Sequence, residues 1–276
     1  MNFELRNIFI GVLLLLFSAC EVIPGDERDQ VIFTPTDSSA VKRTSLLIEY
    51  SGWKCVNCPT AAEEAHRLKE QYGEQLVVVV MHPESNPNTR HNNKPALNYT
   101  CPEADSIYIM MGGTNTTPFP TGNLNLVKDE EKGYFNDYDK WATLVSQAYS
   151  TPRPILMNQE VSGIADSKEI TVTVDITNVD TKVLEATLQV WLTEDSVMGR
   201  QDGAPDPKNY AHNHLMRASI SPIWGNKLMI DAHSTEQMIY QYTLPEKVVN
   251  KNCNIVSLVS LNGDVVQATE TKITIE

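Results

Sequence analysis

Two cysteines separated by two residues constrain the fold of this chain more than any other feature. Cys55 and Cys58 follow a short apolar segment, 46–50, and belong to or precede a segment with helical character, 56–72. This order predicts a buried strand, a tight connection and a helix, with Cys55 at the helix N-terminus. There the unpaired backbone N–H groups and the helix dipole favour an anion, which lowers the pKa of a thiol. The pattern therefore predicts a redox-active pair.

The first 19 residues have the pattern of a secretory signal. Arg6 precedes an apolar run, 8–17, that is too short to span a bilayer. The run ends in FSAC, where small residues before Cys20 resemble the lipobox of bacterial lipoproteins. We therefore expect residues 1–19 to be a lipoprotein signal peptide, Cys20 to carry lipid, and residues 20–44 to be a tether. The alternative is a plain signal peptide followed by an unmodified cysteine.

The net charge of −13 argues against negatively charged binding partners. Nucleic acids and anionic lipid surfaces attract basic patches, so neither is an expected partner. The sequence instead predicts partners among envelope or surface proteins, with membrane contact through the lipid on Cys20. We predict no cofactor.

The period of the apolar residues changes near residue 152. Before it, strands and helices alternate, which predicts an α/β domain over residues 45–152. The expected strands are 46–50, 76–81 and 121–127, and the expected helices are 56–72, 104–111 and 138–149. Pro152 and Pro154 then end the last helix.

After this boundary, apolar and polar residues alternate with a period of two. Five strands are expected, at 169–179, 185–195, 235–244, 254–261 and 265–275. Strands of this kind joined by Asn, Asp and Gly turns predict antiparallel sheets with one buried face. We therefore expect residues 153–276 to form an all-β immunoglobulin-like sandwich.

The first domain resembles the thioredoxin fold, in which an apolar strand ends in a buried acid shortly before two cysteines. Glu49 occupies the position of that acid, and the resemblance implies that it moves protons to and from Cys58. Burial would raise its pKa; the alternative is an edge carboxylate facing water. The fold also has a cis-proline opposite the cysteines. Pro120 is the preferred candidate because a strand is expected directly after it, and Pro118 is the alternative.

The resemblance implies a thiol–disulfide exchange reaction. A Cys55 thiolate would attack a substrate disulfide, and Cys58 would resolve the mixed disulfide. Cys55 is then expected to be exposed and Cys58 more buried. Lys54 stands before Cys55 where the family has Trp, and Val56-Asn57 replaces the common Gly-Pro. These departures leave the redox direction open. In the alternative, the pair is a structural disulfide.

The remaining histidines give weak signals. His82, His91 and Cys101 lie in a polar insertion, but their spacing matches no tight zinc pattern. The insertion is expected to shape access to the cysteine pair or to supply a third thiol at Cys101. His212 and His214 would share a face on a strand, yet no third ligand is close in sequence. We therefore predict no metal site and keep this histidine pair as a weak alternative.

Two further cysteines, Cys101 and Cys253, are far apart in the sequence. They are expected either to be bonded to each other or to be separate buried thiols. Separate roles are favoured because the two belong to different predicted domains.

Several segments together resemble one family. They are GWKCVNCP in the first half, VWLTEDSV and YAHNHLMR in the second half, and the N-terminal lipobox. They are similar to the outer membrane protein 28 family of Gram-negative lipoproteins. The resemblance implies an outer-membrane-anchored protein that is either periplasmic or surface-exposed. Thiol–disulfide exchange on envelope proteins is the leading hypothesis; a non-enzymatic adhesin or binding module is the alternative.

Overall fold

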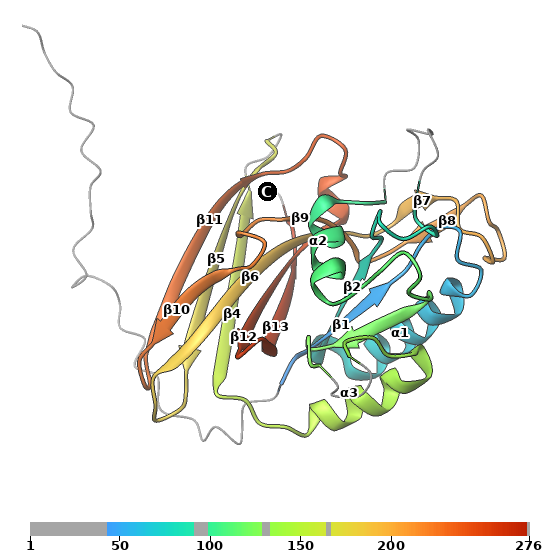
Figure 1. Ribbon diagram of the computed structural model, residues 1–276. Helices are drawn as coiled ribbons and strands as arrows, with labels where there is room; N and C mark the ends of the chain where they lie inside the picture. Colours follow the sequence, from blue (N-terminus) through green and yellow to red (C-terminus); the bar gives the residue numbers. More distant parts are fainter. Residues whose placement is uncertain (1–42, 91–98, 129–132, 164–166, 275–276) are drawn as a thin grey trace, which may run out of the picture. The chain divides into compact units, whose positions relative to one another are not determined.

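A computed structural model of the chain describes residues 43–90, 99–128, 133–163 and 167–274 (Figure 1). The predicted signal peptide, Cys20, nearly all of the predicted tether and His91 lie outside the described residues. Within the described ranges, every helix is too short or too polar to cross a membrane.

The first half of the described chain alternates strands with helices, as predicted. The elements are β1 (Ser45–Tyr50), α1 (Cys58–Tyr72), β2 (Leu76–Met81), α2 (Pro102–Met110), β3 (Thr121–Leu124) and α3 (Trp141–Tyr149). Strand β1 pairs in parallel with β2 and antiparallel with β3. Helix α1 begins two residues later than predicted, and a short 3-10 turn, Tyr138–Lys140, precedes α3.

The second half is built from strands. They are β4 (Ile155–Gly163), β5 (Glu169–Asn178), β6 (Leu184–Glu194), β7 (Val197–Gly199), β8 (Tyr210–His212), β9 (Leu215–Ser219), β10 (Asn226–Ile230), β11 (Thr235–Thr243), β12 (Cys253–Leu261) and β13 (Asp264–Lys272). The five predicted strands correspond to β5, β6, β11, β12 and β13. Four of the others, β7 to β10, have only three to five residues each, which is too short for a clear period of two.

The strands form one large mixed sheet and two smaller sheets. The order in the eight-stranded sheet is β13-β12-β6-β9-β2-β1-β3, and β10 also pairs with β6. A three-stranded sheet has the order β11-β5-β4, and β7 pairs with β8. The large sheet therefore contains strands from both sides of the predicted boundary at residue 152. The domain boundaries themselves stay predictions.

Strand β9 connects the two halves of the large sheet. It pairs antiparallel with β6, and its first residue, Leu215, pairs in parallel with Val80 of β2. The backbone N–H of Val80 donates to the carbonyl oxygen of His214 at 2.8 Å. The chain preceding β9, which includes the β7–β8 hairpin, is thereby held beside the end of β2.

Helices cover both faces of the strands in the first half (Figure 1). Leu47 shares a buried cluster with residues of α1 and α3, whereas Leu46 and Ile48 share another with residues of α2. Side chains alternate between the faces of a strand. Glu49 therefore points to the same face as Leu47, which is the face covered by α1. In this register the Glu49 carboxyl points toward the helix that begins with Cys58.

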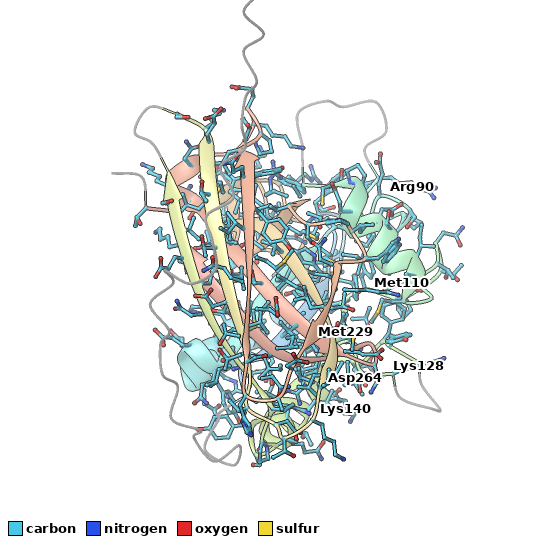
Figure 2. The ribbon with its side chains drawn as sticks, turned by 90° about the vertical axis from the view of Figure 1, so that its left-hand side faces the viewer. Arg90, Met110, Lys128, Lys140, Met229 and Asp264 are labelled. Atoms are coloured by element: carbon cyan, nitrogen blue, oxygen red, sulfur yellow. A yellow bond between two sulfur atoms is a disulfide. The ribbon has the colours of Figure 1, made fainter. Side chains whose placement is uncertain are left out.

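A third core cluster lies between the large sheet and the three-stranded sheet. It combines alternate residues of β5, such as Val172 and Val174, with residues of β6 and β12, such as Leu188 and Ile255. The second half is thus a packed pair of sheets with an apolar interior. By contrast, Met229 of β10 lies among the side chains at the surface, where it is 60% exposed (Figure 2).

Candidate functional site: a disulfide beside a carboxyl-lined cavity

A disulfide joins Cys55, in the connection between β1 and α1, to Cys58, the first residue of α1, and their Cα atoms lie 5.4 Å apart. Two successive tight turns make this connection. The Cys55 N–H donates to the carbonyl of Gly52 at 2.9 Å, and the Cys58 N–H donates to the carbonyl of Cys55 at 3.3 Å. Asn57 is the helix N-cap, so α1 begins at Cys58. The prediction that Cys55 lies at the helix N-terminus is wrong, because the second turn separates it from the helix.

Cys55 is also more buried than predicted. Its exposed fraction is 5%, against 1% for Cys58. The cause is a contact from the second half of the chain, the loop 200–209 that joins β7 to β8, here called the hairpin loop. The Gln201 side-chain amide donates to the Cys55 carbonyl at 2.9 Å. The backbone N–H of Asp202 donates to the Trp53 carbonyl at 2.7 Å.

Lys54 contacts the polar insertion that follows β2. Its ammonium donates to the carbonyl of Arg90 at 2.7 Å and lies 4.8 Å from the centre of the Trp53 ring. The ammonium also donates to the carbonyl of Pro87 at 3.4 Å, so its contacts are two backbone carbonyls and an aromatic face. These contacts hold the Lys54 side chain against the insertion and Trp53.

Glu49 is buried, with an exposed fraction of 1%. Among the described residues, neither carboxylate oxygen has a hydrogen-bond partner of standard geometry. Burial disfavours the ionised form and raises the pKa of Glu49 to about 8, and the Ser51 hydroxyl offsets this effect only in part. The buried-acid prediction is therefore confirmed over the water-facing alternative. A carboxyl with this pKa is mostly protonated at neutral pH and exchanges its proton readily in this range.

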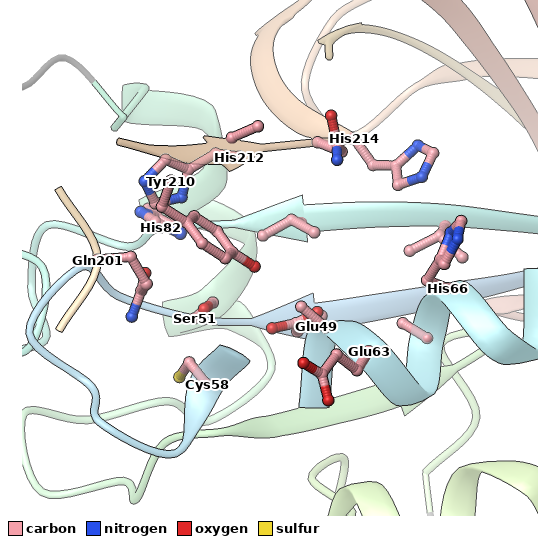
Figure 3. A pocket seen from close by; sticks show the side chains of 16 residues that line it. Glu49, Ser51, Cys58, Glu63, His66, His82, Gln201, Tyr210, His212 and His214 are labelled. Atoms are coloured by element: carbon pink, nitrogen blue, oxygen red, sulfur yellow. The ribbon is translucent and has the colours of Figure 1, made fainter. Parts of the chain in front are cut away.

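A cavity of about 310 Å³ brings Glu49 and Cys58 to one site (Figure 3). Its open side carries Glu63 and His66, two exposed residues of α1. His82, Tyr210 and His212 gather at the opposite end (Figure 3). The cavity thus gives a buried carboxyl and the inner cysteine a shared space that reaches solvent along α1.

Two groups at the inner end of the cavity are uncharged near neutral pH. Burial lowers the pKa of His212 to about 4, and a contact of its Nε2 with the Arg200 carbonyl at 3.2 Å acts in the opposite direction. Burial first, and the nearby Glu49 charge second, raise the pKa of Tyr210 to about 12. Neither group changes its charge between pH 6 and 9, whereas Glu49 does.

His212 and His214 do not converge on one point. Strand β8 ends at His212, and His214 has a left-handed backbone, with φ 56°. The His212 ring lies 4.3 Å from the Tyr99 ring, between ring centres, whereas His214 Nδ1 lies 3.4 Å from an Asp195 carboxylate oxygen. In the described part of the chain, no three His, Cys, Asp or Glu side chains are grouped to hold a metal ion.

The peptide bond between Phe119 and Pro120 is cis, the isomer predicted for Pro120. The next residue, Thr121, pairs with Tyr50 at the end of β1. Pro120 therefore lies at the sheet edge from which the cysteine connection leaves. Its catalytic role, like those of Cys55, Cys58 and Glu49, stays a prediction.

The other two described cysteines are separate. Cys101, the N-cap of α2, and Cys253, the first residue of β12, are buried free thiols. Burial raises the pKa of each to about 12. Cys101 does not line the cavity. Neither thiol is therefore in a reactive form near neutral pH.

Two of the residues around the disulfide were missed by the sequence interpretation. Gln201 and Tyr210 come from the second half of the chain, where no local pattern connects them to the cysteines. Tyr210 does belong to the segment YAHNHLMR, which also contains the histidine pair. No sequence signal identifies Tyr210 as a site residue, because only the tertiary structure shows that this segment lies beside the end of β2.

The fold and the site define a mixed α/β and all-β protein with a CxxC disulfide beside a buried acid. Residues 111–276 match the family model described as outer membrane protein Omp28. This match covers more than half of the chain, and the chain belongs to the Omp28 family. The match includes the hairpin loop and excludes the Cys55–Cys58 pair. The family description supports an outer-membrane location. Among curated proteins, none matches the chain significantly.

The solved structures that are similar to the chain include three bacterial proteins. HBP35 of Porphyromonas gingivalis is 16% identical, with a TM-score of 0.66, over 85% of this chain and 76% of that one. A domain of the outer membrane lipoprotein Omp28 from P. gingivalis is 21% identical, with a TM-score of 0.34, over 45% and 91%. Protein AGR_C_4864 from Agrobacterium tumefaciens is 15% identical, with a TM-score of 0.47, over 86% and 98%. Of these three, HBP35 has a score that shows a shared fold.

Proposed function

We propose that this protein exchanges thiols and disulfides with envelope proteins while anchored to the outer membrane by lipid on Cys20. The observation that carries the proposal is the shared cavity of Cys58 and Glu49, in which a buried carboxyl with a pKa of about 8 adjoins a disulfide. A disulfide that serves only as a staple has no need of a nearby proton acceptor. An acid that titrates close to neutral pH suits proton transfer at a thiol.

The arrangement around the pair supports a thioredoxin-like interpretation of residues 45–152. Strand β1 leads into the cysteines, α1 follows them, β2 returns in parallel, and β3 begins directly after cis-Pro120. The packed sheets of the second half fit the immunoglobulin-like interpretation of residues 153–276 in their layers. In this proposal the second half is a platform that completes the site through the hairpin loop.

The exchange reaction proceeds in two displacements. The Cys55 thiolate attacks one sulfur of a substrate disulfide, so that a mixed disulfide forms and one substrate thiolate leaves. Cys58 then loses its proton to the ionised Glu49 carboxylate and attacks the Cys55 sulfur. This second step forms the Cys55–Cys58 disulfide and releases the second substrate thiolate, so the substrate gains two electrons and the pair loses two. The reverse sequence oxidises a dithiol substrate.

The acidic chain and its family suggest where the substrate is found. A net charge of −13 disfavours nucleic acids, and membership of the Omp28 family supports the outer membrane. Substrates are therefore proposed among periplasmic or surface-exposed proteins with accessible disulfides. The anchor at Cys20 would keep the site within reach of the membrane surface.

The decisive variant is Cys55→Ser, with Cys253→Ala as a matched control. With dithiothreitol supplied to reduce the pair again after each cycle, we expect wild-type protein to turn over insulin or glutathione disulfide, Cys55→Ser to lose that catalysed turnover because it lacks the attacking thiolate, and Cys253→Ala to retain it. Turnover by Cys55→Ser at the wild-type rate would contradict the proposal. The proposal would also be contradicted if the wild-type protein showed no turnover and its reduced cysteine pair reacted with a thiol reagent as thiols of ordinary pKa do.

A second candidate function is a non-enzymatic surface lipoprotein that binds another protein, with the cysteines as a structural staple. The observation favouring it is the 5% exposure of Cys55 beneath the hairpin loop, because a covered sulfur is poorly accessible to a protein substrate. This alternative predicts slow reduction of the pair in the folded protein and no turnover in the assay above.

A further inference from the structure

We propose that Gln201 is a positioning residue for the Cys55–Cys58 pair, and that the hairpin loop sets the equilibrium between its disulfide and dithiol forms. This inference rests on the proposed exchange function. Gln201 lies 146 positions after Cys55, and its exposed fraction is 2%. Burying a polar side chain of this size is unfavourable unless its hydrogen-bonding groups find partners. Two of the three acceptors of its side-chain amide are carbonyls at the redox pair.

The Gln201 amide bonds to the carbonyls that close both turns around Cys55. The Gly52 carbonyl closes the first turn and the Cys55 carbonyl closes the second. Gln201 Nε2 lies 3.2 Å from the first of these oxygens and 2.9 Å from the second. It also lies 3.2 Å from the carbonyl oxygen of Asp202, so its two protons are shared among three acceptors. One amide therefore fixes the backbone on both sides of Cys55.

The rest of the hairpin loop follows the same stretch of backbone. The Asp202 N–H donates to the Trp53 carbonyl at 2.7 Å, and the Arg200 guanidinium lies 5.7 Å from the centre of the Trp53 ring. Gly203 has a left-handed backbone, with φ +85°, and a Cβ there would collide with the main-chain carbonyl of Val56. Only glycine permits this approach without displacement. The loop thus spans the cysteine connection from Trp53 to Val56.

This restraint has a consequence for the redox equilibrium. The reaction converts the disulfide and two glutathione molecules into two protein thiols and one glutathione disulfide. Closing the disulfide restricts the connection between the cysteines, and the entropic cost is smaller when that connection is already held. Gln201 therefore favours the disulfide. A loop that merely covered the sulfurs would slow both directions equally and leave the equilibrium constant unchanged.

The test compares Gln201→Ala and Gly203→Ala with a matched control, Gln189→Ala. Gln189 is also buried, at 8%, and donates to the carbonyl of Ile223 at 2.7 Å, with no contact to the pair. Each full-length protein is equilibrated in glutathione buffers of stepped ratio, quenched with acid, and its free thiols are counted by mass spectrometry. We expect the first two variants to shift about tenfold toward the dithiol, which corresponds to about 30 mV. Gln189→Ala should match the wild type.

An unchanged equilibrium constant in both Gln201→Ala and Gly203→Ala would overturn the inference, even if their thiols labelled faster. If Gln201→Ala does not fold, Gly203→Ala alone decides, because it keeps the amide and displaces the loop. A wild-type pair that stays oxidised at every glutathione ratio would instead argue against the proposed function. The same comparison is then made with dithiothreitol as the reductant.

Discussion

Replacing Glu49 with Gln should stabilise the protein at pH 8.5 and leave it nearly unchanged at pH 4. In the folded chain the pKa of Glu49 is raised from 4.5 to about 8. Between these values the unfolded chain releases a proton that the folded chain retains, so the free energy of unfolding falls as the pH rises. At about 1.4 kcal/mol for each pKa unit, the penalty above pH 8 is on the order of 5 kcal/mol. A glutamine at this position does not titrate and avoids that penalty.

Urea unfolding of the oxidised protein at pH 4, 6 and 8.5 measures this difference. The matched control is Glu63→Gln, which changes an exposed carboxyl of α1 that lines the same cavity. We expect the control to follow the wild-type curve, while the Glu49→Gln curve separates from it progressively above pH 5. Parallel curves for wild type and Glu49→Gln would show that Glu49 does not retain a proton in the folded state.

A comparably large effect is expected from Glu194→Gln, which breaks a buried ion pair. Glu194 on β6 lies 3.1 Å from Arg217 on β9, and both side chains are at most 4% exposed. The second carboxylate oxygen accepts the N–H of Val249 at 2.7 Å. Removing the negative charge takes this counter-ion away from a buried guanidinium, and such changes cost about 3–5 kcal/mol. The variant should therefore unfold at markedly lower urea concentration at pH 7.

A double-mutant cycle isolates this pair. Arg217→Met removes the guanidinium and leaves the carboxylate, and combining it with Glu194→Gln removes both charges. We expect the double variant to be more stable than the sum of the two single losses predicts, by at least about 2 kcal/mol. Additive losses would mean that the two side chains do not act as a pair. Because β9 joins the two halves of the large sheet, this pair stabilises the junction beside the site.

The local features of the site were predictable from the sequence because they depend on neighbouring residues. The apolar strand before Cys55, the helix after Cys58, the alternation that buries Glu49 and the strand that begins after Pro120 all produce short-range patterns. Family membership was also predicted. These features determine which groups are present at the site and on which face of the sheet they lie.

The long-range features were not predictable, because they do not depend on residues that are neighbours in the sequence. Strands β7 and β8 are three residues long, and the contact of Gln201 with Cys55 joins positions 146 residues apart. No local period signals such a contact. The burial of Cys55 and the sharing of one sheet by both halves follow from tertiary packing. The largest error therefore concerned access to the pair rather than its presence.

The reduction potential of the wild-type Cys55–Cys58 pair tests the central claim most directly. Exchange-active pairs have potentials between about −270 and −120 mV, whereas structural disulfides of secreted proteins fall below about −300 mV. We predict a value within the first range, measured by equilibrating full-length protein with glutathione buffers and counting free thiols. A value below about −300 mV would contradict an exchange function and identify the pair as a structural staple.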